Sequence, residues 1–196
     1  MLWDTFLVYP FRVFVVFVHE ISHGLAAVLT GGAIESIGPS VDEGGVCRTR
    51  GGSPFLILNA GSLGSLLWGA LFLVLGGRRT RARGVIAAIG VFTLVVTLLY
   101  VRTLFGFGYG LATGMALVAV ASRLRPAVSE LLLAAIGATS ALYAVWDITT
   151  DVLLRHSGES DAAALAALTL VPAPVWGVLW IAVSLVVLVA VLRRLL

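Results

Sequence analysis

The chain has 196 residues, of which 60% are hydrophobic and 12% are charged, with a formal net charge of +3. Soluble domains carry about 25% charged residues, so this composition, with several apolar runs of bilayer-spanning length, excludes an ordinary soluble domain and indicates a membrane protein. All 13 basic residues are arginines that stand near the ends of apolar runs rather than on one face, which excludes a nucleic-acid partner.

Six apolar segments predict an all-α polytopic membrane protein whose transmembrane helices, about six in number, form one bundle. No repeat or second soluble domain interrupts them, so residues 1–196 are expected to form a single domain. A break at Arg102 and the glycine-rich run 106–110 separates the third and fourth segments, because an unpaired arginine at mid-membrane is costly and clustered glycines weaken a helix. A mere kink there would leave five spans. The predicted spans are 5–29, 54–76, 85–101, 105–122, 127–151 and 171–192.

The longest polar connection, residues 30–53, contains a predicted strand. Residues 46–50 are flanked by glycine pairs at 44–45 and 51–52, which favour a turn on each side. Such a strand fits an ordinary surface hairpin, or an added strand that pairs with an extended peptide substrate. Its Cys47 is the only cysteine, which excludes an intrachain disulfide and a cysteine-based metal site.

The arginines also predict an orientation. They gather without acidic neighbours in the connections 77–84 and 123–126 and at the C-terminus, and such an excess marks the cytoplasmic side. With six spans, both termini are therefore expected inside the cell. Because lysine is absent while Ala, Gly, Val and Leu abound, the composition is typical of a GC-rich bacterial genome. We expect an integral, multi-pass protein of a bacterial cell membrane.

The first apolar segment carries a His-Glu-x-x-His motif at residues 19–23. Residues four apart share one face of a helix, so His19 and His23 can offer two imidazoles to one Zn²⁺. Glu20 can then act as the general base that takes a proton from water. Coincidence is the weaker explanation, because a charged Glu in an apolar helix is costly unless paired or functional. The motif also holds two of the three histidines.

A hydrolytic zinc site needs a third protein ligand and an open position. Asp147, near the end of the fifth apolar segment, is the expected third ligand, and helix rise places it on the same side of the membrane as His19. Asp151, four residues further along the same face, is the alternative. The remaining histidine, His156, falls in a polar connection and is expected to be solvated.

Other polar and aromatic residues have structural explanations. Asp161, which follows Ser160, is expected in the first turn of a short helix, where an acid favours the helix dipole, rather than in catalysis. Asn59 is either an oxyanion donor or a helix-capping residue. Trp176 and Trp180 are expected to pack against the bundle or to anchor it at the membrane interface.

Residues 19–27 resemble the metal-binding helix of the site-2-protease (M50) family, and the chain resembles its M50B-like branch most closely. The resemblance covers nearly the whole chain and implies an intramembrane zinc metallopeptidase. It further implies His19 and His23 as ligands, Glu20 as base, and an Asp from a later helix as third ligand. Better-known site-2 proteases carry that Asp in a Leu-Asp-Gly sequence, which is absent here. The other elements that carry the resemblance are Gly31-Gly32, Asn59-Ala60-Gly61-Ser62-Leu63-Gly64, Trp146-Asp147, Ser160-Asp161 and Trp176-Gly177-Val178-Leu179-Trp180.

The function expected from these residues is hydrolysis of peptide bonds in membrane-embedded substrates by a zinc-activated water with Glu20 as general base. The expected partners are a membrane protein or peptide substrate and the lipid bilayer. One alternative is a non-catalytic membrane protein that retains the metal site for stability or for binding a partner's transmembrane helix. A metal transporter comes third, because only one helix shows a clear cluster of ligands.

Overall fold

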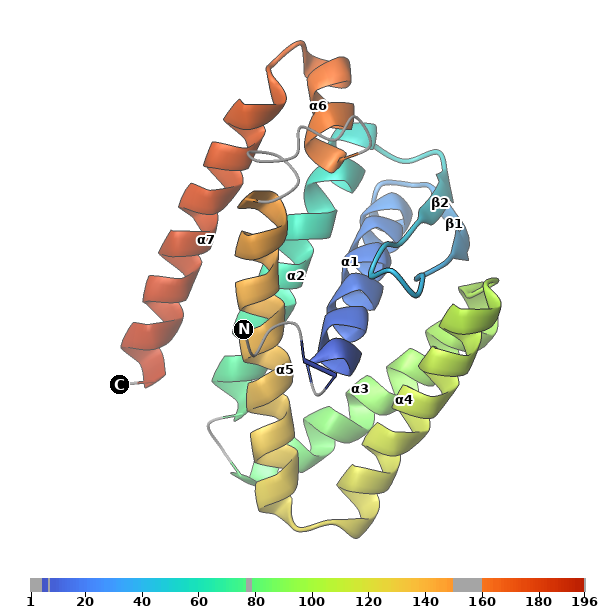
Figure 1. Cartoon of the computed structure of the whole chain (residues 1–196), viewed down its shortest axis with the longest axis vertical. Coiled ribbons are helices and arrows are strands. Elements are labelled where there is room, and N and C mark those ends of the chain that lie inside the picture. Colours follow the sequence, from blue (N-terminus) through green and yellow to red (C-terminus); the bar gives the residue numbers. More distant parts are fainter. Residues whose placement is uncertain (1–4, 7, 77–78, 150–159, 196) are drawn as a thin grey trace.

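A computed structural model describes residues 5–6, 8–76, 79–149 and 160–195. Within these residues the chain forms seven helices and one two-stranded antiparallel sheet (Figure 1). In chain order the elements are α1 (Tyr9–Leu29), β1 (Ala33–Ile37), β2 (Cys47–Arg50), α2 (Pro54–Gly76), α3 (Arg79–Tyr100), α4 (Leu104–Arg123), α5 (Pro126–Asp147), α6 (Asp161–Thr169) and α7 (Ala173–Leu195).

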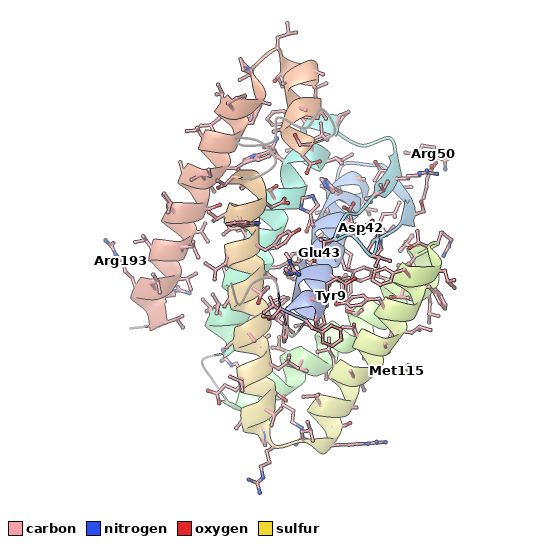
Figure 2. The ribbon with its side chains drawn as sticks, in the orientation of Figure 1. Tyr9, Asp42, Glu43, Arg50, Met115 and Arg193 are labelled. Atoms are coloured by element: carbon pink, nitrogen blue, oxygen red, sulfur yellow. The ribbon has the colours of Figure 1, made fainter. Side chains whose placement is uncertain are left out.

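Every described helix except α6 is long and apolar enough to cross a membrane, which gives six spans. The prediction of an all-α polytopic membrane protein with about six transmembrane helices is therefore confirmed. Apolar side chains cover the outer faces of these helices, and Met115 of α4, for example, projects away from the bundle (Figure 2). The arginine-based orientation stays a prediction, because helix positions do not reveal which end faces the cytoplasm.

The predicted break at Arg102 between the third and fourth spans is confirmed, but the glycine-rich run at 106–110 is not part of it. The break lies at residues 101–103, and the run is helical within α4. Gly110 of this run is needed where α4 packs on α3, because a Cβ there would collide with the Thr97 side chain. Glycine weakens an isolated helix, but in a bundle it allows two helices to approach closely.

The arginine-rich connection is also more helical than its composition suggests, since α3 begins at Arg79 rather than at residue 85. Arg83 donates hydrogen bonds to the backbone carbonyls of Ala121 and Ser122 at the end of α4. These carbonyls have no partner within their own helix. The arginine therefore caps a neighbouring helix while it continues its own.

The first helix, α1, lies inside the bundle, where it packs against α2, α5 and both strands (Figure 1). Helices α2 and α5 approach closely beside it, because Gly69 and Gly137 face each other and leave no room for side chains. A large apolar cluster joins α1 to α2, α3, α4 and α5. Its buried members include Phe14, Val18, Phe72, Ile86, Leu117, Leu133 and Ile136. This packing surrounds α1 and positions the helix that carries the motif.

The strand predicted at residues 46–50 is confirmed as β2, and it pairs with β1 of the same chain in an antiparallel hairpin. The hairpin folds back along α1, and buried Ile37 of β1 packs against Phe17 and Ile21. Gly24 of α1 allows the hairpin to approach the helix closely, because a Cβ there would lie 2.7 Å from the Ile34 side chain of β1. Pairing of β2 with a substrate strand stays a prediction.

Candidate metal centre

The His-Glu-x-x-His motif lies in the middle of α1, on the face that turns away from the apolar cluster. The His19 and His23 rings lie one turn apart, with centroids 4.7 Å apart and planes at 74°. Glu20 and His23 are buried, and the His19 side chain is 17% exposed. The helical spacing thus brings the two imidazoles together, as the motif predicts.

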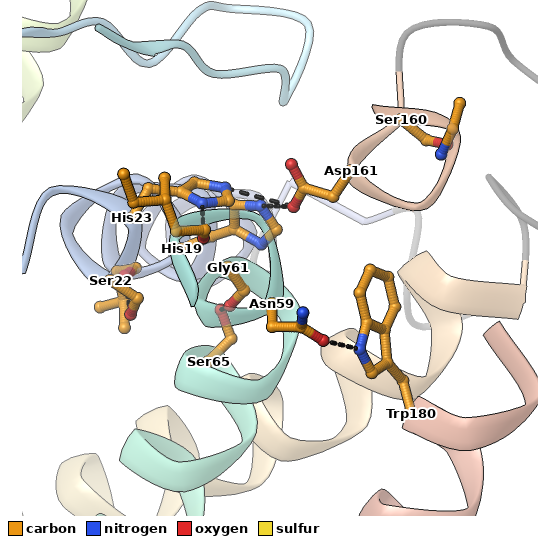
Figure 3. Close-up of polar contacts among 12 residues, drawn as sticks. His19, Ser22, His23, Asn59, Gly61, Ser65, Ser160, Asp161 and Trp180 are labelled. Carbon is orange, nitrogen blue, oxygen red and sulfur yellow. Dashed lines mark hydrogen bonds and ion pairs between the residues drawn. The ribbon is translucent and has the colours of Figure 1, made fainter. Parts of the chain in front are cut away.

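The carboxylate that meets both imidazoles belongs to Asp161. Its Oδ2 atom lies 3.2 Å from Nε2 of His19 and 3.2 Å from Nε2 of His23 (Figure 3). The expected helix start is also present, since Ser160 caps α6 by accepting a hydrogen bond from the Ala163 backbone N–H. Asp161 therefore occupies the first turn of α6, as expected, and in addition completes a cluster that was expected to use another acid.

The environment of Asp161 favours its ionised form. Burial by itself raises the pKa of this carboxyl. Hydrogen bonds and electrostatic attraction from His19 and His23 outweigh burial, so that the pKa of Asp161 lies well below its usual value. A carboxylate must be deprotonated to bind a metal, and this one is ionised at neutral pH.

The donor atoms fit a zinc ion. One ligand atom each from His19, His23 and Asp161 lies within 4.8 Å of the other two. Two atoms bound to one tetrahedral Zn²⁺ at about 2.0–2.1 Å lie about 3.3 Å apart, close to the 3.2 Å observed between each imidazole and Asp161. Two imidazole nitrogens and one carboxylate oxygen are also the donor types of hydrolytic zinc sites.

Helix α2 supports this cluster from one side. His23 Nδ1 lies 2.7 Å from the backbone carbonyl of Ile57, a contact that fixes the ring and leaves Nε2 free to bind a metal. Gly61 lies directly against the two rings, because a Cβ there would collide with Nε2 of both His19 and His23. The small residue is thus required for the imidazoles to occupy their positions (Figure 3).

A cavity of about 300 Å³ opens beside the cluster. His19, Glu20, His23 and Asp161 line it together with Asp147 of α5. Asp147 therefore lies near the motif, as predicted from helix depth, but the three residues whose donor atoms converge do not include it. Its role as third ligand stays a prediction. The alternative ligand Asp151 lies outside the described residues, as does His156, which was expected to be solvated.

A second cavity of about 420 Å³ borders His23 and Asp161, and Cys47 and Thr49 of β2 line it. Burial, with the nearby negative charge of Glu20, raises the pKa of the Cys47 thiol to about 12. The thiol is therefore protonated at neutral pH and reacts slowly.

Asn59 does not cap a helix start, since it is the sixth residue of α2. Its side-chain oxygen accepts a hydrogen bond of 2.8 Å from the Trp180 indole N–H, and its amide nitrogen donates one of 2.8 Å to the Phe55 carbonyl (Figure 3). Trp180 is 3% exposed, which confirms that it packs inside the bundle. The pair joins α7 to α2 two residues before Gly61.

Comparison with protein families gives one match that spans almost the entire chain. A family model described as Peptidase M50B-like matches residues 1–191. No curated protein and no solved structure matches the chain.

Proposed function

The chain belongs to the peptidase M50B-like family, and we propose that it is an intramembrane zinc metallopeptidase that hydrolyses peptide bonds of membrane-embedded substrates. Its six spans make it a multi-pass integral membrane protein. The observation that carries the proposal is the convergence of His19, His23 and Asp161 on one point beside Glu20.

In this proposal Asp161 is the third metal ligand. It touches both imidazoles, it is ionised, and its oxygen lies at the separation expected for ligands of one zinc ion. Asp147 lines the same cavity and remains the alternative predicted from the sequence. With either acid, three protein ligands leave one position for the water or the substrate.

Zinc bound to these residues supplies Lewis-acid chemistry, which makes water a stronger acid and polarises the scissile carbonyl. Glu20 borders the same cavity and accepts the proton of the attacking water. It then delivers this proton to the leaving amine. The substrate segment must unwind locally before attack, because a helix hides its carbonyls in hydrogen bonds.

The variant Glu20→Gln separates an enzyme from a protein that only retains a metal site. Glutamine keeps the size and a hydrogen-bonding group but does not accept a proton at neutral pH. We expect normal zinc content and a fall in turnover of at least about a hundredfold. The measurement is cleavage, in proteoliposomes, of a fluorogenic transmembrane peptide with a glycine pair at mid-membrane, together with zinc analysis by mass spectrometry.

His23→Ala is the companion variant, and we expect it to lose both zinc and activity. A Glu20→Gln protein that cleaves the peptide at the wild-type rate, or fully complements a deletion strain, would contradict the catalytic role whatever its zinc content. The non-catalytic alternative would then be favoured, with the metal stabilising the bundle or a partner's transmembrane helix.

A further inference from the structure

The connection between the two strands, residues 38–46, forms part of the wall of the proposed active site. Two backbone hydrogen bonds between Gly38 and Val46, of 2.9 and 3.2 Å, close the base of this loop. Glu43, Gly44 and Gly45 line the cavity that also contains Glu20. The 38–46 loop therefore lies where it can affect the proposed general base directly.

The loop backbone touches the Glu20 side chain. A Cβ added at Gly45 would lie 2.7 Å from Glu20 Cγ and 2.8 Å from Cδ, so only glycine permits this approach. The backbone of Cys47, where the loop enters β2, also interacts with the Glu20 carboxylate. A shift of the loop by a fraction of an ångström would consequently move the carboxylate or change its surroundings.

Two side chains near the start of α1 hold the loop in this position. Arg12 Nη2 lies 2.9 Å from Glu43 Oε1, and these side chains are only 13% and 22% exposed. The Tyr9 hydroxyl donates a hydrogen bond of 2.9 Å to the Val41 carbonyl. Figure 2 shows Tyr9 and Glu43 beside the N-terminal half of α1. Arg12 and Glu20 share a helix face and lie about 12 Å apart along the axis.

Both residues of the ion pair, Arg12 and Glu43, are costly at their positions, and the contact between them explains why they are there. Arg12 stands within a transmembrane span, where a charged side chain is costly unless it is paired. Glu43 adopts a φ of 60°, a left-handed conformation that glycine would accept without strain. The two glycines that follow occupy neighbouring positions, yet the strained position is a glutamate that reaches Arg12.

We propose that Arg12 is a positioning residue, which through Glu43 holds the 38–46 loop against Glu20 and so keeps the proposed general base in its working position. This inference rests on the proposed function of Glu20. Release of the ion pair lets the loop withdraw from the cavity, so the same contact sets how readily the site opens to an extended peptide.

The only thiol of the chain, Cys47, reports the position of the loop without any engineered probe. It directly follows the loop and is partly buried. We expect Glu43→Gln to raise the rate of Cys47 modification by a small maleimide about tenfold, because the loop opens more often without the ion pair. With zinc content unchanged, kcat for the fluorogenic transmembrane peptide should fall about tenfold, since a displaced base acts less well.

The matched control is Glu35→Gln on the same hairpin. Glu35 lies 3.8 Å from Arg50 in an exposed ion pair, and neither residue lines the two cavities beside the cluster, so its loss should change neither labelling nor kcat. The double variant Arg12→Glu with Glu43→Arg should restore slow labelling, a rescue that a general loss of stability would not give. Tyr9→Phe, a milder change, should raise labelling about threefold.

Labelling is measured without substrate, so its outcome does not depend on catalysis. Wild-type labelling rates in both Glu43→Gln and Tyr9→Phe, or an equal rise in Glu35→Gln, would overturn the positioning role and leave the proposed hydrolysis intact. Faster labelling in Glu43→Gln combined with a fully active Glu20→Gln protein would preserve the loop contact but remove the base that it is proposed to position.

Discussion

The first and last transmembrane helices differ most in hydrophobicity and in burial. Helix α7 is the most hydrophobic of the six described spans, and only 22% of its spanning segment is buried inside the protein. Helix α1 is the least hydrophobic span, and 67% of it is buried. Its buried residues include Glu20, Ser22 and His23, whereas α7 presents valines and leucines to the outside.

This difference arises because the bundle is surrounded by lipid rather than by water. A soluble protein buries its most apolar helix, but lipid is itself apolar and gives such a helix no reason to leave the surface. Polar and ionisable groups are costly in lipid, so the helix that carries them moves to the interior, where other helices and the hairpin supply partners. The least hydrophobic span therefore indicates the functional helix.

The largest expected effect concerns the acid that completes the cluster on α1. Asp161→Ala should lower zinc affinity by more than about a hundredfold, because even partners of metal ligands contribute ten- to a hundredfold. Asp147→Ala is the matched control, since Asp147 lines the same cavity without joining the convergent donors. Zinc titration of both purified variants decides the matter, and the reverse result would assign the third ligand to Asp147.

A smaller effect on zinc affinity is expected at Gly61, which packs directly against both imidazole rings. Gly61→Ala places a methyl group against His19 and His23, so we expect zinc affinity to fall about tenfold. Gly108→Ala in α4 is the control, because a Cβ there meets nothing within 4 Å. Competition with a chelator of known affinity measures both. Equal affinities would mean that α2 adapts to the methyl group without disturbing the site.

The smallest effects distinguish the two faces of α7. Trp180→Phe leaves Asn59 without its indole donor, which should destabilise the protein by about 1–3 kcal/mol. Val186, 69% exposed on the same helix, is expected to contact lipid, and Val186→Ala should change stability by less than about 0.5 kcal/mol. Thermal unfolding in detergent micelles compares them. A comparable loss for Val186→Ala would show that this outer face is covered by protein rather than lipid.

Several features of the fold could be predicted because their signals are local. Spanning segments appear as apolar runs, and the hairpin appears as a strand between glycine pairs. Helix boundaries were predicted less accurately where a residue of one helix packs against or caps a neighbouring helix. The glycines at 106–110 signal a break in an isolated helix, yet they are helical within α4, where Gly110 allows close packing on α3. Arg83, which precedes residue 85, continues α3 and caps α4.

For the site, the arrangement of the histidine pair and the neighbouring glutamate could be predicted, because their spacing on one helix already places them on one face. Which acid meets them depends on how α6 packs against α1. Ser160-Asp161 has the same local sequence whether α6 is solvated or docked, so its capping role was predictable and its contact with the histidines was not. The contact of Asp161 with the histidines, like that of Arg12 with Glu43, depends on how distant segments pack against α1. The periodicity of a local sequence does not predict such packing.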